Sequence, residues 1–97
     1  MDPIHPEETR IVGGWILEHG RMLDDAASLR IHELVATHLV KLGHDWSGWG
    51  TLYRDPTDGR LWELTYPQGD MQGGGPRTLQ VLSEAAARSK YPGVLPT

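Results

Sequence analysis

Residues 49–67 read WGTLYRDPTDGRLWELTYP, so two strand-like runs flank five residues that favour a turn. Asp55 and Pro56 are typical of the start of a type I turn, and Gly59 supplies the position of positive φ that closes it. We therefore predict a β-hairpin here. Aromatic residues occur on both strands, and a face that carries Trp and Tyr without being needed for the core is a candidate binding surface.

The register of this hairpin decides which side chains share a face. With Arg54 placed opposite Arg60, the alternation of side chains along each strand sorts the residues into two sets. The set expected to meet the core is Leu52, Trp62 and Leu64. The set expected to point outward is Trp49, Thr51, Tyr53, Leu61, Glu63 and Thr65. A slip of one residue would exchange the two faces.

The flanking segments predict an α+β fold. A main helix is expected over about residues 25–42, because apolar residues recur there at helical spacing. Asp24 or Asp25 can cap its first turn, and Gly43 can end it. Further elements are expected at residues 11–17 (a strand with Gly13-Gly14 as a bulge or point of close approach), 21–23 and 78–82 (strands) and about 84–90 (a short C-terminal helix capped by Ser83). Together they predict an antiparallel sheet of about four or five strands packed against the main helix.

The length and composition of the chain limit the number of domains and the kinds of site and partner that it can have. The 97 residues make one domain, 1–97, in which the polar, proline-bearing residues 1–9 are expected to be a flexible tail. Because the chain has no Cys, a disulfide, a thiolate zinc site and a Cys nucleophile are excluded, which fits a cytoplasmic protein. Thirteen acidic against nine basic residues give a net charge of −4, which disfavours nucleic acid and anionic membranes and favours a basic partner.

No cofactor or metal site is predicted. The glycine-rich residues 73–75 lead through Pro76-Arg77 into a strand, whereas a phosphate-binding P-loop needs Gly-Lys-Ser/Thr opening a helix. The histidines at 32, 38 and 44 are spaced by six, and two imidazoles share a helical face when spaced by four. His38 lies on the apolar stripe of the helix, so we expect it to bond a backbone carbonyl or a neighbouring side chain.

Carboxylates and tryptophans each allow two interpretations. Asp55 and Asp58 are expected to cap amides of the turn rather than to act as an acid–base pair. Glu63 would need a partner and a pocket to act as a general base, and otherwise pairs across the strands with Thr51 or with Arg54, Arg60 or Arg77. Trp15 and Trp62 are expected to be structural. Trp46 and Trp49 either form a recognition patch or bridge the sheet rim and the helix end.

Three motifs together resemble the immunity protein 27 family of bacterial polymorphic toxin systems: Ser47-Gly48-Trp49-Gly50-Thr51-Leu52-Tyr53-Arg54-Asp55-Pro56, then Asp58-Gly59-Arg60-Leu61-Trp62-Glu63-Leu64-Thr65-Tyr66-Pro67, then Gly73-Gly74-Gly75-Pro76. The resemblance extends over roughly residues 13–91. It implies a cytoplasmic protein that binds and neutralises a cognate toxin domain by occlusion, without catalysis of its own. The acidic charge would suit a basic nuclease as that toxin.

The expected contacts to the toxin are Trp49, Tyr53, Asp55, Asp58, Glu63 and Asp70. Two other classes remain open. A module that binds a small ligand or serves a structural role would use the glycine-rich loop. A small enzyme would place Glu63 in a pocket as acid or base. The oligomeric state does not follow from the sequence.

Overall fold

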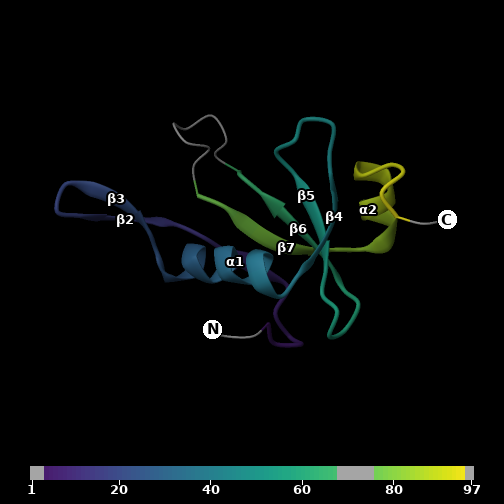
Figure 1. Cartoon of the computed structure of the whole chain (residues 1–97), viewed down its shortest axis with the longest axis horizontal. Helices are drawn as coiled ribbons and strands as arrows, with labels where there is room; N and C mark the ends of the chain where they lie inside the picture. Colours follow the sequence, from purple (N-terminus) through teal and green to yellow (C-terminus); the bar gives the residue numbers. More distant parts are fainter. Residues whose placement is uncertain (1–3, 68–75, 96–97) are drawn as a thin grey trace.

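The computed structural model of the chain describes residues 4–67 and 76–95. Along these residues the elements are β1 (Arg10–Val12), β2 (Trp15–Glu18), β3 (Arg21–Asp24), α1 (Ala26–Thr37), β4 (Val40–His44), β5 (Thr51–Arg54), β6 (Leu61–Thr65), β7 (Thr78–Leu82) and α2 (Glu84–Lys90). One antiparallel sheet has the strand order β1-β7-β6-β5-β4, and β2 pairs with β3 in a separate two-stranded sheet (Figure 1). The predicted α+β class is confirmed. No helix within the described residues is long and apolar enough to cross a membrane.

Both faces of the five-stranded sheet are covered by apolar side chains. One cluster packs with α1 and consists of Ile11, Ile31, Leu34, Leu39, Tyr53, Trp62, Leu64 and Leu79. The other packs with α2 and the C-terminal segment and consists of Leu52, Leu61, Ala87, Tyr91 and Leu95. Trp62, predicted to be structural, is completely buried at the centre of the first cluster.

The predicted register of the β5–β6 hairpin is wrong by one residue. Arg54 lies opposite Leu61, not Arg60, and Tyr53 lies opposite Trp62. The physical reason is the turn. The amide of Asp55 donates to the carbonyl of Arg60 over 2.9 Å, which leaves a loop of four residues, 56–59, instead of five. This loop is closed by the amide of Gly59, at φ 78°, which donates to the carbonyl of Asp55.

The one-residue shift exchanges the faces of the β5 residues, whereas the β6 residues keep their predicted faces. Tyr53 joins Trp62 and Leu64 against α1, whereas Leu52 lies beside Glu63 on the face covered by α2. The predicted outward face of the hairpin is therefore not an open surface.

The main helix is shorter than predicted. Asp25 caps α1 as expected, because its carboxylate accepts the amide of Ser28 over 2.8 Å. The helix ends at Thr37, however, and the residues predicted to form its last turn make the edge strand β4, which pairs with β5. Gly43 lies within this strand and not at a helix end, and a side chain there would collide with Val94. Pairing with β5 outweighs the local preference for helix.

The predicted strand at residues 11–17 is divided between two sheets. β1 pairs with β7, and β2 leaves the sheet to pair with β3. The division falls at Gly13-Gly14, where a bulge or close approach within a single strand was predicted. The amide of Gly13 donates to the carbonyl of Arg77 over 2.8 Å, and a side chain at Gly13 would meet that carbonyl and the Ser28 hydroxyl.

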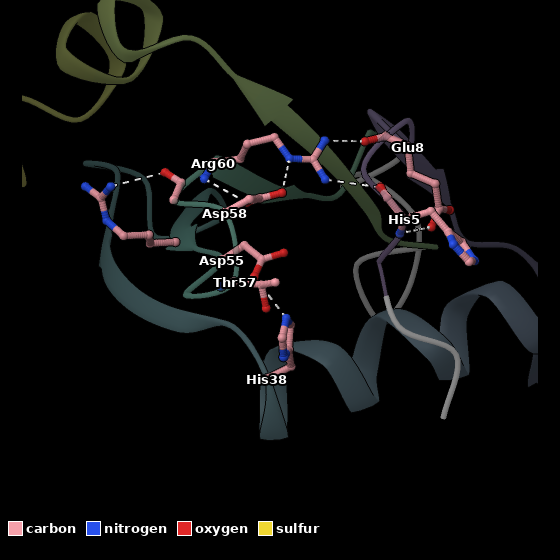
Figure 2. A network of polar contacts seen from close by, with 9 residues as sticks. His5, Glu8, His38, Asp55, Thr57, Asp58 and Arg60 are labelled. Atoms are coloured by element: carbon pink, nitrogen blue, oxygen red, sulfur yellow. Dashed lines mark hydrogen bonds and ion pairs between the residues drawn. The ribbon is translucent and has the colours of Figure 1, made fainter.

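The segment predicted as a flexible tail makes defined contacts from residue 4 onward. Ile4 packs against the first cluster, and Arg30 binds the Glu8 carboxylate through two hydrogen bonds of 2.6 and 2.9 Å. Arg60 donates to the carbonyls of His5 and Glu8 (Figure 2). The β5–β6 turn and α1 thus hold the N-terminal segment.

The Glu8–Arg30 ion pair predicts acid sensitivity. The hydrogen bond from Arg30 lowers the pKa of Glu8 from 4.5 to about 2. Because this pKa is depressed in the folded state, its stabilisation is present above about pH 4.5 and is lost as the pH falls towards 2. Glu8 stays partly exposed, so we expect a contribution of about 1–2 kcal/mol. Urea unfolding between pH 7 and 2.5 should show this loss in the wild type. A Glu8→Gln variant should be less stable at pH 7 and should lack that part of the pH dependence, and parallel curves for the two proteins would contradict the assignment.

Candidate functional site

The loop between β4 and β5, residues 45–50, is called the aromatic loop here because it carries Trp46 and Trp49. Its shape is set by one carboxylate. Asp45 Oδ1 accepts the hydroxyl of Ser47 over 2.6 Å, the amides of Ser47 and Gly48 over 3.0 Å each, and the amide of Gly50 over 3.4 Å. The Ser47 hydroxyl and these amides lower the pKa of Asp45 below its ordinary value of 3.8, so the charge that holds the loop is present at neutral pH.

The two tryptophans of this loop are presented to solvent. Trp46 is 96% exposed and Trp49 is 53% exposed. The Trp49 ring packs edge to face against the ring of Tyr66, with the two centroids 5.5 Å apart. Gly50, at the end of the loop, has no room for a side chain, because a Cβ there would collide with Asp45 and the Tyr91 hydroxyl. Two large apolar rings are thus displayed on a loop whose backbone is already ordered.

Asp55 and Asp58 do cap the β5–β6 turn as predicted. Asp55 accepts the amide of Thr57 over 2.8 Å, and Asp58 accepts the amide of Arg60 over 3.0 Å (Figure 2). Asp55 is buried and also bonds His38 Nε2 over 3.0 Å, which confirms a neighbouring side chain as the partner of that histidine. Asp58 stays accessible at the turn and pairs with the Arg60 guanidinium over 2.7 Å.

Glu63 is buried beneath α2. Its partners differ from those predicted, which were Thr51, Arg54, Arg60 and Arg77. It accepts the hydroxyl of Tyr91 over 2.7 Å and the ammonium of Lys90 over 2.6 Å. Tyr91 is 1% exposed, and burial together with the Glu63 carboxylate raises its pKa, so the hydroxyl remains a donor at neutral pH. This arrangement fastens the end of α2 to the sheet.

The cavities and the acidic and histidine side chains of the described residues bear on catalysis and metal binding. Glu63 does not line either of two cavities, of about 350 and 320 Å³, that lie among the described residues. Arg88, on the larger cavity, is held by two hydrogen bonds to Glu84. Within residues 4–67 and 76–95, no three His, Asp or Glu side chains converge as metal ligands. Asp70 and the glycine-rich residues 73–75 lie outside the described residues.

A second exposed feature was not singled out from the sequence. The β2–β3 hairpin, residues 15–24, is called the arm here. It carries four solvent-exposed aliphatic side chains, namely Ile16, Leu17, Met22 and Leu23. A half-buried strand alternates between apolar and polar residues, and neither strand of the arm does so strictly. This lack of alternation is the sequence signal that would have drawn attention to the arm.

With this geometry in place, the comparison with known families decides the identity of the chain. The model of the family Immunity protein 27 matches residues 17–83. The chain belongs to the immunity protein 27 family. Neither a curated protein nor a solved structure matches it.

As a member of the immunity protein 27 family, the chain is an immunity protein, and the family implies a non-enzymatic role with a protein toxin as partner. The matched residues include the aromatic loop, the β5–β6 turn and all but the first residues of the arm. The aromatic loop and the β5–β6 turn therefore lie wholly within the matched part of the chain, and the arm lies mostly within it.

Proposed function

We propose that this immunity protein acts in the cytoplasm of the producing cell, where it binds the toxin domain of a polymorphic toxin and blocks it by stoichiometric occlusion. The family match over residues 17–83 carries this proposal. The exposed tryptophans support it, because Trp buried on binding is among the strongest contributors to protein interfaces. The buried, internally satisfied Glu63 supports binding without turnover.

The proposed toxin is basic, for example a nuclease. The net charge of −4 favours association with a positively charged protein through electrostatic steering. Such steering raises the association rate and weakens as salt rises.

Among the predicted contacts, we propose that Trp49 and Asp58 touch the toxin directly, joined by Trp46. Tyr53, Asp55 and Glu63 are buried in the free protein, at 8%, 2% and 5% exposure. Their proposed contribution is to hold the hairpin and α2 in place beneath that surface. Asp70 remains a proposed contact outside the described residues.

The direct test uses the toxin domain encoded by the gene immediately upstream. Expressed alone, this domain should arrest growth, and co-expression of the immunity protein should restore it. The purified proteins should form a 1:1 complex by light scattering. Absence of both rescue and complex formation would remove the basis of the proposal.

The aromatic loop predicts a separable effect on binding. We expect Trp46→Ala and Trp49→Ala each to weaken toxin binding by about 10- to 100-fold, because each removes a large ring from the interface. Calorimetric titration measures this. Trp46→Ala should leave the thermal midpoint unchanged, since the ring is 96% exposed. Val40→Ala, at an exposed position on β4, is the matched control. Wild-type affinity in both Trp variants would exclude the aromatic loop from the contact.

A further inference from the structure

The arm projects away from the five-stranded sheet, at the end of the molecule opposite α2 (Figure 1). Its strands pair with each other in full register, from Trp15 opposite Asp24 to Glu18 opposite Arg21. The two residues between them, His19 and Gly20, have φ of 52° and 76°. Positive φ at both central residues is the type I′ geometry, which matches the natural twist of a hairpin. The arm therefore has a defined shape before it meets any partner.

The base of the arm is fixed to the body through the start of α1. The amide of Asp25 donates to the carbonyl of Gly14 over 3.0 Å, and the Ser28 hydroxyl donates to the same carbonyl over 2.9 Å. Ser28 is completely buried. The direction in which the arm points is thus tied to the helix cap.

Both faces of the arm are apolar and exposed. Cross-strand partners share a face, so Ile16 and Leu23 lie on one side, 46% and 40% exposed. Leu17 and Met22 lie on the other side, 71% and 56% exposed. An exposed antiparallel hairpin ordinarily turns a polar face to water, and contiguous exposed aliphatic groups mark an interaction site.

The charges around these side chains indicate the chemistry of the partner. Within the arm, Glu18 and Asp24 stand against Arg21, so the arm carries an excess of one negative charge, and the Asp25 carboxylate that caps α1 adds a second at its base. A second copy packed on the arm about a two-fold axis would bring the same excess against itself. A partner with basic residues around an apolar site is complementary to it.

We infer that the arm inserts into an apolar cleft, bordered by Lys or Arg, of the cognate toxin domain. A cleft is required because a flat surface can cover only one of the two apolar faces. This inference rests on the proposed function and names how the occlusion is achieved. The arm enters the toxin, and the aromatic loop forms a separate contact.

The test measures affinity for the toxin domain of the upstream gene with one double variant per face, Leu17→Asn with Met22→Asn, and Ile16→Asn with Leu23→Asn. Each should weaken binding about 100-fold, because each leaves one wall of the cleft without its apolar partner. Val40→Asn, an equally exposed aliphatic position outside the arm, should change affinity less than threefold. All three proteins should keep the wild-type circular dichroism spectrum, since the replaced side chains are exposed.

Amide hydrogen exchange of the wild-type complex gives a second measurement that needs no variant. Exchange at residues 15–24 should slow when the toxin domain binds.

Wild-type affinity in both double variants, or unchanged exchange in the arm, would overturn the insertion while leaving the immunity function standing. Loss of affinity in only one double variant would indicate a flat contact and overturn the cleft. A wild-type dimer that the double variants dissociate would identify a second copy as the occupant. If the wild type does not bind the toxin domain, the proposed function fails and the inference fails with it.

Discussion

Trp62→Ala should lower the free energy of unfolding by about 3–5 kcal/mol, because it removes a completely buried ring from the centre of the larger core cluster. The ring lies on β6, between its neighbouring strands and beneath α1. It also supports the Arg60 guanidinium, which lies 5.1 Å from the ring centroid. Urea unfolding followed by circular dichroism measures the change independently of tryptophan fluorescence.

The matched control is Trp46→Ala, which removes the same side chain from a position that is 96% exposed. It should cost less than about 0.5 kcal/mol. The pair separates the two roles of tryptophan in this chain, since Trp62→Ala should reduce stability and Trp46→Ala should reduce toxin binding. Equal unfolding curves for the two variants would contradict the placement of Trp62 in the core.

Glu63→Ala should lower the free energy of unfolding by about 3 kcal/mol. It leaves the Tyr91 hydroxyl, which is 1% exposed, without its acceptor and opens space beneath α2. Urea unfolding at pH 7 measures the loss. In the wild type, α2 should unfold together with the rest of the chain on heating. Tyr91 directly follows that helix and anchors it to the sheet through Glu63.

Glu63→Gln is the control that separates the two contacts of this residue. The amide oxygen can still accept from Tyr91, and only the ion pair with the half-exposed Lys90 is lost. Such a pair contributes about 1 kcal/mol or less. If Glu63→Gln were as damaging as Glu63→Ala, the ion pair and not the Tyr91 hydrogen bond would be the main contribution.

Local signals predicted much of the fold correctly, because they depend on residues close together in the chain. Asp25 and Ser83 cap their helices through carboxylate and hydroxyl groups that accept amides three residues on. The β5–β6 hairpin, the strand at β3 and the bounds of α2 follow from the same kind of pattern. The family resemblance was likewise carried by a continuous motif and is confirmed by the match over residues 17–83.

The candidate site was predicted less completely. Trp46 and Trp49 were predicted either to form a recognition patch or to bridge the sheet rim and the helix end; both rings are exposed, and their role in recognition stays a prediction. The arm was missed as a surface, because exposure of both its faces depends on its projection from the body. Glu63 was assigned the wrong partners, since Tyr91 is 28 residues away and reaches it only when α2 folds back over the sheet.

The sequence by itself determined the class of the fold, the helix caps and the family, since each is encoded in short-range chemistry. The tertiary structure alone decided the end of α1, the register of β5 against β6 and which apolar side chains stay exposed. Those outcomes depend on pairing between strands and on packing against both faces of one sheet. In this chain a turn shorter by one residue moved Leu52 and Tyr53 to the sides of the sheet opposite to those predicted.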